Sequence, residues 1–392
     1  MYRPLEGIKI LDCTRLLPYQ YCTMLLGDLG AEVLKIEEPR EGDYGRWGDA
    51  DRTYESETFV MINRNKKSMK LNLKHEKGRA IFKKLAIGFS VLVESFRPGV
   101  MARLGVGYED IKQINPSIIY CSTTGFGQTG PYRSRVGHDI NYLGYSGVLA
   151  CTGELTGQPV IPGIPIGDMA GGGLTTAMVI LAAIVGRERT GKGQYIDVAQ
   201  TDVLTSLNVR NIAEVLAQKK GRTARPLDIR GFNICYNTYK TSDGKFIAFG
   251  PVEPKFWQNF CKAVGKEAWI SDHLLGYKDG SRATEALKKL FAGKTRKEWE
   301  AIFENVESCV SPVLSPEETL EDEHLKERGM FTRMDDPERG ESVQLGFPAK
   351  FSDDLEFKRS PAPFFGEHTE EVLSGLGHSE ADIEMLKKEG VI

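Results

Sequence analysis

Short apolar runs alternate with helical patterns along the first half of the chain, and this alternation limits the possible folds most strongly. In chain order, apolar runs at residues 8–12, 32–36, 91–94 and 117–122 are separated by helical patterns at 19–29, 76–86 and 108–114. Strands that alternate with helices form βαβ units, whose parallel strands are buried on both faces. The sequence therefore predicts an α/β fold built on a Rossmann-like parallel sheet.

The second half predicts a different, smaller unit. Helical patterns at 139–150, 171–187 and 199–218 precede a polar, basic stretch at 219–230, which we interpret as a linker. Two strand patterns, at 234–241 and 245–250, follow and are joined by Ser242-Asp243-Gly244, a strong hairpin signal. Further helices are expected at 254–264, 282–291, 296–303 and 380–388. This stretch predicts an α+β unit.

Composition excludes several classes of protein. The 51 Lys and Arg residues nearly balance 54 Asp and Glu, which argues against a nucleic-acid binder and requires a local cationic patch for any polyanionic ligand. We expect no secretion signal, and we expect residues 170–186 to form a buried helix and not a membrane span. The seven cysteines lack a C-x-x-C pair, which favours reduced thiols in the cytoplasm, and no sequence motif indicates a metal.

Two familiar motifs are present only in part. Residues 125–130 match G-x-G-x-x-G, but Pro131-Tyr132-Arg133 follows instead of an apolar helix start, so a glycine-rich turn is favoured over a dinucleotide site. Gly144-Tyr145-Ser146-Gly147 lacks the G-x-S-x-G spacing of a serine nucleophile.

Three acid–base candidates remain. Gly137-His138-Asp139 places an imidazole at a helix start, with Asp139 as a capping residue, and the helix terminus favours neutral imidazole. Asp168 precedes the most apolar helix and Gly171-Gly172-Gly173; it is either an N-cap or a carboxylate in a desolvated pocket. Glu253 follows a strand end. Taken singly, a structural histidine and a surface glutamate are the simpler interpretations of the first and the last.

Two loops carry clustered cations that can clamp phosphate. Residues 63–67 include Lys66, and residues 96–103 include Arg97 and Arg103. Solvated surface is the simpler interpretation of each cluster, but together they would supply the local patch that the balanced net charge requires.

Together these segments resemble the family III CoA-transferases (the CaiB/BaiF superfamily), over nearly the whole chain. The segments that carry the resemblance are residues 4–12, 26–36, 96–107 and 124–131. Residues 137–142, 252–256 and 309–318 resemble more narrowly the α-methylacyl-CoA racemases. The resemblance implies an interlocked homodimer. It also implies a discontinuous large domain (1–218 and 331–392) that binds CoA, a linker at 219–230 and a small α+β domain at 231–330.

In family racemases, residues matching His138 and Asp168 exchange the proton at the α-carbon, and one matching Glu253 partners the histidine. A two-base inversion beside a thioester carbonyl suits these groups, with the Asp139 N–H as an expected donor to the enolate oxygen. Arg103, Arg97 and Lys66 are the expected contacts to CoA phosphates. No cofactor beyond the CoA moiety of the substrate is expected.

The sequence departs from the racemase pattern at two places. Arg230 to Cys235 replace an acidic-Gly-Gly-Ala-Pro stretch near the acyl pocket, which leaves the range of acyl groups open. Glu38 stands where many members carry a nucleotide-binding arginine, with Arg40 as the nearest substitute.

The resulting hypothesis is a racemase or epimerase of 2-methyl-branched acyl-CoA thioesters. The alternative is a CoA-transferase that moves CoA between carboxylic acids through an acyl-aspartyl anhydride on Asp168. A third possibility, a non-catalytic CoA-binding subunit, is disfavoured because Asp168 is retained. The expected partners are acyl-CoA and a second copy of the chain, with no nucleic acid and no membrane.

Overall fold

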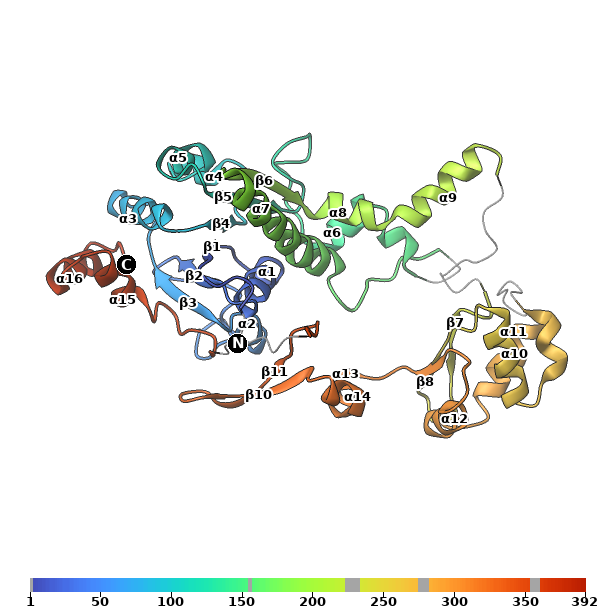
Figure 1. Ribbon diagram of the computed structural model, residues 1–392. Helices are drawn as coiled ribbons and strands as arrows, with labels where there is room; N and C mark the ends of the chain where they lie inside the picture. The colour runs from blue at the N-terminus through green and yellow to red at the C-terminus, as the bar shows by residue number, and fades with distance from the viewer. Residues whose placement is uncertain (1–2, 154–156, 223–232, 274–281, 353–359) are drawn as a thin grey trace. The chain divides into compact units, whose positions relative to one another are not determined.

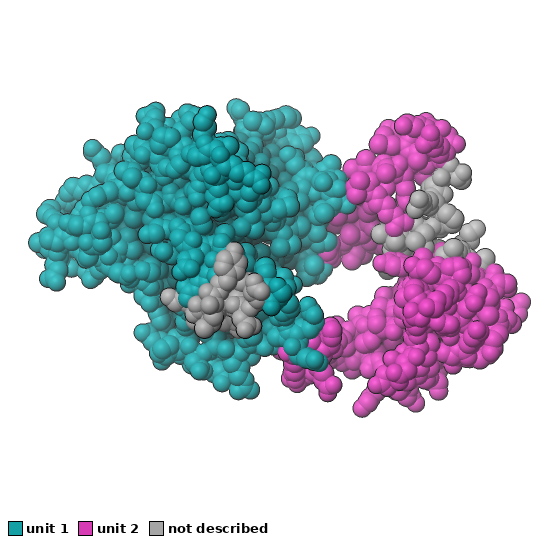
Figure 2. All heavy atoms as spheres, viewed as in Figure 1, with its two compact units in different colours: residues 1–146, 163–207, 327–392 teal, residues 147–162, 208–326 magenta. Residues whose placement is uncertain are grey.

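A computed structural model of the chain describes residues 3–153, 157–222, 233–273, 282–352 and 360–392 (Figure 1). The chain forms two compact units, coloured separately in Figure 2. Unit 1 comprises residues 1–146, 163–207 and 327–392, and unit 2 comprises residues 147–162 and 208–326. The unit that contains both ends of the chain is therefore built from three separate segments.

Unit 1 is built on a six-stranded sheet in which every neighbouring pair of strands is parallel. Across the sheet, the strands are β3 (Lys66–Lys70), β2 (Glu32–Glu37), β1 (Lys9–Cys13), β4 (Val91–Glu94), β5 (Ile119–Thr124) and β6 (Gln194–Ala199). This order confirms the predicted Rossmann-like parallel sheet. It reverses between β1 and β4, and the carboxyl ends of strands at such a reversal form a natural binding crevice.

Successive strand residues point to opposite faces of this sheet, and apolar residues point to both. Helices therefore cover both faces. Leu11, Leu34 and Leu92 pack with α3 (Glu76–Ile87), α5 (Tyr108–Ile114), α15 (Thr369–Gly375) and α16 (Glu380–Lys388). Their strand neighbours Ile10 and Val33 pack with α1 (Leu17–Asp28) and α7 (Thr176–Thr190) on the other face. Figure 1 shows α15 near β3, the edge strand of the sheet, with α16 next to α15.

The remaining elements of unit 1 are short. They are α2 (Glu57–Ile62), α4 (Val100–Arg103), α6 (Asp139–Tyr145), the π-helix η2 (Gly167–Thr175), α8 (Gln200–Leu207) and the antiparallel hairpin β10 (Phe331–Asp336) and β11 (Gly340–Leu345).

Unit 2 contains the predicted hairpin, β7 (Asn237–Lys240) and β8 (Phe246–Phe249), and a third antiparallel strand, β9 (Val310–Pro312). Gly244 in the turn has φ +80°, a conformation that glycine adopts readily. The sheet packs against α10 (Pro254–Ala263), α11 (Arg282–Phe291) and α12 (Arg296–Phe303) through an aromatic core. The other elements are α9 (Val209–Lys219), η1 (Leu149–Cys151), η3 (Glu267–Asp272), α13 (Pro316–Glu321) and α14 (Glu323–Glu327), whose last residue belongs to unit 1.

Several predicted elements need correction. Residues 66–70 are strand β3 and not part of a loop, and β6 was not predicted at all. Both edge strands carry polar residues that hide the apolar pattern, but Met69 and Val198 are buried. The helix predicted at 199–218 is two helices, α8 and α9, separated by Asn208, and the one predicted at 139–150 ends at Tyr145.

The division into units also differs from the predicted domain boundaries. Residues 147–162 and α9, which were predicted in the large domain, group with unit 2. The Cys151 thiol lies 3.9 Å from Asn208 Oδ1, so the two segments meet at the start of α9. Residues 223–230 of the predicted linker lie outside the described residues. So do residues 230–232 of the segment Arg230 to Cys235, which departs from the racemase pattern.

The helical run Gly167–Thr190 is the one segment among the described residues that is long and apolar enough to cross a membrane. Its inward side, which includes Ala177, Ile180 and Ile184, packs in the core of unit 1. Leu174, Met178 and Val185 on its outward side are exposed.

Candidate functional site

The π-helix η2 carries Asp168 into a tightly packed part of unit 1. A Cβ on Gly171 would lie 2.9 Å from Gln200 Cα, and one on Gly172 would lie 2.5 Å from Pro18 Cβ. The glycines therefore let η2 approach both α1 and α8. Wide helical turns of this kind often occur at functional sites. Asp168 is the second residue of η2 and Ile166 is its N-cap, so the N-cap role considered for Asp168 is wrong.

Asp168 has an unusual electrostatic environment. Burial and, after it, the neighbouring carboxylate of Asp139 raise the pKa of this half-buried carboxyl group to about 6. A hydrogen bond from the Gln200 side chain and the proximity of His138 act in the opposite direction on this pKa. A carboxyl group with a pKa near 6 exchanges protons readily near neutral pH. This result agrees with the predicted desolvated carboxylate.

The start of α6 meets the start of η2. His138 is the N-cap of α6, its side chain is exposed, and its N–H donates to Asn141 Oδ1 at 3.0 Å. Asp139 is the first helical residue, so it does not cap α6 as predicted. Its Oδ1 instead accepts a hydrogen bond of 3.0 Å from the Asp168 N–H. This bond holds Asp168 close to the start of α6, where His138 lies directly before Asp139.

The backbone N–H of Asp139 stays a candidate for binding an enolate oxygen. It belongs to the first turn of α6, whose N–H groups find no carbonyl partner within the helix. Such a donor favours negative charge, which the helix dipole also favours.

Glu253 belongs to unit 2, at the N-cap of α10 directly after the segment that follows β8. Its carboxylate is exposed, and together with burial it raises the pKa of the Cys309 thiol. Cys309 directly precedes β9 with φ +51°, and its thiol is close enough to Glu253 at the start of α10 to feel its charge. The predicted partnership of Glu253 with His138 stays a prediction.

A hollow of about 530 Å³ lies at the carboxyl ends of β1, β2 and β3, beside the reversal of strand order. Its cationic lining residues are Arg15, Arg40 and Lys74, and Phe96, Val100 and Leu104 form an apolar wall. The Arg15 guanidinium lies 5.2 Å from the centre of the Phe96 ring. Arg40 was predicted from the sequence, whereas Arg15 and Lys74 were not. Both follow the carboxyl ends of strands, β1 and β3, where ligands of parallel sheets bind.

Arg97 and Arg103 lie within the segment 96–104 that forms this apolar wall. Both are exposed, and Arg103 ends the short helix α4. Arg97 also lines a separate hollow of about 320 Å³ that contains the buried carboxyl of Glu94. Burial raises the pKa of Glu94 to about 7, against a lowering effect of hydrogen bonds from Ser122 and the Phe96 N–H.

The structure places Lys66 differently from the prediction. Its Nζ is fully buried and donates to Asp12 Oδ2 at 3.3 Å, to Gln20 O at 2.9 Å and to Asn63 Oδ1 at 2.9 Å. The Lys66 ammonium group therefore donates to three protein acceptors and not, as predicted, to a CoA phosphate.

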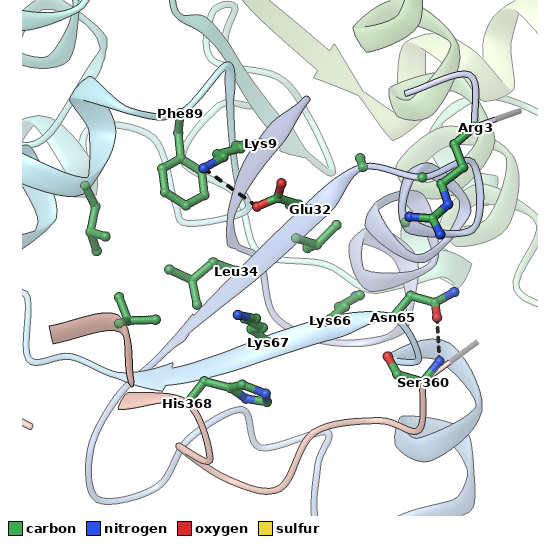
Figure 3. A pocket seen from close by; sticks show the side chains of 16 residues that line it. Arg3, Lys9, Glu32, Leu34, Asn65, Lys66, Lys67, Phe89, Ser360 and His368 are labelled. Carbon is green, nitrogen blue, oxygen red and sulfur yellow. Dashed lines mark hydrogen bonds and ion pairs between the residues drawn. The ribbon is translucent and has the colours of Figure 1, made fainter. Parts of the chain in front are cut away.

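Lys66 also lines a hollow of about 450 Å³ over β2 and β3, shown in Figure 3. There the neighbouring Lys67 side chain pairs with Glu371 at 2.6 Å. No group of three or more His, Cys, Asp or Glu residues in the described part of the chain is arranged to hold a metal ion.

Comparison with known proteins gives one family over nearly the whole chain. A family model described as CoA-transferase family III matches residues 5–369. The alpha-methylacyl-CoA racemase of Homo sapiens is 36% identical, with 99% of this chain and 97% of that protein covered. The succinyl-CoA:glutarate CoA-transferase of Mus musculus is 35% identical, with 100% and 90% covered.

Among solved structures, a CaiB/BaiF family protein from Brucella suis aligns with a TM-score of 0.82 at 29% identity, covering 96% of this chain and all of that one. The sequence relatives thus include both a racemase and transferases at nearly equal identity, and all of their names refer to CoA chemistry.

Proposed function

Because the chain belongs to CoA-transferase family III, an enzyme family of racemases and CoA-transferases, we propose that it inverts the α-carbon of 2-methyl-branched acyl-CoA thioesters. The observation that carries this proposal is the environment of Asp168. The pKa of its carboxyl group is raised to about 6, and Asp168 lies at the start of η2, which meets the start of α6 and His138. Inversion without a cofactor needs two groups that can each give and accept a proton near neutral pH.

In the proposed reaction, the substrate carbon lies between these two groups. In one direction the Asp168 carboxylate removes the α-proton, the electron pair moves into the thioester carbonyl, and the Asp139 N–H stabilises the enolate oxygen. His138, protonated before this step, then delivers a proton to the opposite face of the carbon. In the other direction the roles are exchanged. Glu253 is proposed to orient His138, as a carboxylate does in a triad.

The CoA part of the substrate is proposed to occupy the hollow at the carboxyl ends of β1, β2 and β3. Arg15, Arg40 and Lys74 supply positive charge there beside the carboxylates of Glu38 and Glu41, and the apolar wall around Phe96 suits the adenine ring. Arg97 and Arg103 are proposed to contact phosphate from the adjacent loop. These cations supply the local patch that the nearly balanced net charge of the chain requires.

The alternative is a CoA-transferase in which the Asp168 carboxylate attacks the thioester and forms a mixed anhydride. The nearly equal identity to a succinyl-CoA:glutarate CoA-transferase supports this alternative. The proximity of His138 to Asp168 favours the first proposal, because inversion needs a second proton-transfer group and attack by a carboxylate on the thioester does not.

One experiment separates the two reactions. The enzyme is incubated with a single stereoisomer of a 2-methylacyl-CoA in deuterated buffer, first without a free carboxylic acid and then with one. A racemase incorporates α-deuterium and loses optical purity in the first incubation. An enzyme that shows neither, but transfers CoA once the acid is added, contradicts the proposal and supports the transferase.

A homodimer is proposed as the working form. Exposed apolar side chains gather on the outward side of η2 and α7, at Leu174, Met178 and Val185, and on α9, at Val209, Val215 and Leu216. Apolar surface of this kind is typical of sites that another protein covers. Sedimentation equilibrium tests this proposal, and a monomer at micromolar concentration contradicts it.

A further inference from the structure

His138 stands at the end of a loop that gives it little support of its own. Residues 129–136, which lead from β5 toward His138, are exposed along their whole length. A side chain that transfers protons nevertheless has to be held close to its working geometry. The support for His138 therefore has to come from elements outside this loop.

The peptide group that joins Gly137 to His138 is held at both of its polar ends by side chains of α6. Its N–H donates to Asn141 Oδ1 at 3.0 Å. Its carbonyl oxygen accepts a hydrogen bond from the Tyr142 hydroxyl at 2.5 Å. Because a peptide group is planar, two bonds to its opposite ends fix the orientation of the whole plane, and with it the direction in which the His138 side chain leaves the backbone.

Tyr142 is itself anchored to the end of the sheet. Its side chain is buried, and its ring meets that of Phe126 edge-on, with 5.2 Å between the ring centres. A Cβ on Gly125, which directly follows β5, would overlap the Tyr142 ring, and one on Gly137 would lie 2.9 Å from its Cε1. Both glycines therefore make room for the ring. The Tyr142 hydroxyl links the position of His138 to the end of β5.

The two bonded residues occupy positions that commonly meet at the start of a helix. Gly137 directly precedes the N-cap His138, and Tyr142 is the fourth residue of α6. A contact between these two positions fixes the angle at which the chain enters a helix. That contact is usually apolar, and here a bond from a hydroxyl to a carbonyl takes its place.

We infer that Tyr142 is a positioning residue for His138, which it holds at the start of α6 through the carbonyl group of Gly137. The hydroxyl donates its proton to the backbone, so Tyr142 acts on the reaction through the histidine and not on the substrate. This inference rests on the proposed function, in which His138 gives or accepts a proton in each turnover.

The test is Tyr142→Phe, which removes the hydroxyl and keeps the ring that packs on Phe126. Each stereoisomer of the substrate presents its α-proton to one of the two bases. For the stereoisomer that faces His138, α-deuterium exchange is expected to fall by about 10- to 100-fold, because a displaced base transfers protons slowly. For the stereoisomer that faces Asp168, exchange is expected to be retained while inversion falls, because Asp168 can return deuterium to the same face.

The matched control is Tyr145→Phe, the same change three residues further along α6. The Tyr145 side chain is exposed, and its hydroxyl accepts a hydrogen bond from Arg135. This control is expected to leave exchange of both stereoisomers in place. An equal fall for both stereoisomers in Tyr142→Phe, a fall for neither, or the same unequal fall in Tyr145→Phe overturns the inference.

A second measurement is independent of activity. Hydrogen–deuterium exchange of the His138 backbone amide, followed by NMR, reports how often its bond to Asn141 Oδ1 opens. Loss of the bond at the other end of the peptide group is expected to speed this amide exchange about tenfold in Tyr142→Phe. An unchanged rate in Tyr142→Phe, or an equal increase in Tyr145→Phe, contradicts the inference.

The two measurements also separate this inference from the proposed function. If the unaltered enzyme shows no α-deuterium exchange with either stereoisomer, the racemase proposal fails, and the role of Tyr142 in proton transfer fails with it. The amide measurement then still decides whether Tyr142 holds this peptide group. If Tyr142→Phe slows α-deuterium exchange of both stereoisomers equally, the racemase proposal stands and the inference about Tyr142 fails.

Discussion

Two regions of unit 1 treat buried charge in opposite ways. Around β1 to β3, Lys66 pairs with Asp12, Lys35 pairs with Asp43 at 3.0 Å, and Arg46 pairs with Glu37 at 2.5 Å. Each of these six side chains is almost fully buried and has an opposite charge beside it. At η2, by contrast, the half-buried carboxyl of Asp168 has a second carboxylate, Asp139, close to it.

The difference shows which region holds the fold together and which is arranged for chemistry. In the paired region, Lys66 and Lys35 keep the pKa of Asp12 below its usual value despite burial, so its charge is fixed at neutral pH. In the region of η2, burial and a like charge raise the pKa of Asp168 to about 6, so its charge changes within the working range. Groups with such shifts concentrate at functional sites.

The largest expected effect follows from Asp168→Asn, which removes the titrating group from the second region. Loss of a proton-transfer residue is expected to reduce α-exchange by about 10²–10⁴-fold. Exchange measured by mass spectrometry checks this, and exchange at the unaltered rate contradicts the role of Asp168 in the proposed inversion.

The same variant is expected to be more stable than the unaltered protein at pH 8. The pKa of Asp168 in the folded chain, about 6, is above its ordinary value of 3.8, so folding disfavours the ionised form. This destabilisation is complete above pH 6 and fades as the pH falls toward 3.8. Thermal unfolding is expected to give a higher Tm for the variant at pH 8, with the difference shrinking between pH 6 and pH 4.

Lys66→Met breaks the paired region and is expected to act on stability. Removing one partner of a buried pair typically costs about 3–5 kcal/mol, because the other charge stays buried. Asp12 still has Lys35, so the lower end of this range is expected. The control is Lys67→Met at the next residue, whose pair with Glu371 is exposed and contributes about 0–1 kcal/mol. Urea unfolding measures both, and equal losses contradict the comparison.

Asp139→Asn removes the like charge that distinguishes the region of η2 from the paired region. It removes the like charge beside Asp168 but keeps an oxygen that can accept the Asp168 N–H. The pKa of Asp168 is then expected to fall, and the acidic limb of the exchange profile to move to lower pH by about one unit. A limb that stays in place or moves upward shows that Asp139 does not influence Asp168 through its charge.

The smallest expected effect is that of Arg15→Ala, at the proposed CoA hollow. Loss of one contact to a phosphate is expected to raise KM for the acyl-CoA about tenfold with little change in kcat, since the phosphate does not react. Steady-state kinetics checks this. Arg189→Ala, at the exposed last turn of α7, is the control, and an equal change in KM there contradicts the placement of CoA in this hollow.

The sequence by itself determined the parallel sheet, because its central strands are continuous apolar runs separated by helices. It determined the bounds of β4, α5, α11, α12 and α16 and the hairpin of unit 2, because their local patterns and turn residues are unambiguous. It also pointed to His138, Asp139 and Asp168, because their neighbouring glycines and helix starts are local features.

Only the tertiary structure decided what these residues meet. β3 becomes a strand because its neighbour β2 pairs with it, although its sequence is rich in lysine. Lys66 is a structural cation because Asp12, far away in the chain, comes within 3.3 Å of it. Asp168 gains its raised pKa from burial and from Asp139, and Gln200 reaches it from the start of another helix. Burial and charge pairing depend on contacts between distant segments, and local sequence patterns carry no record of them.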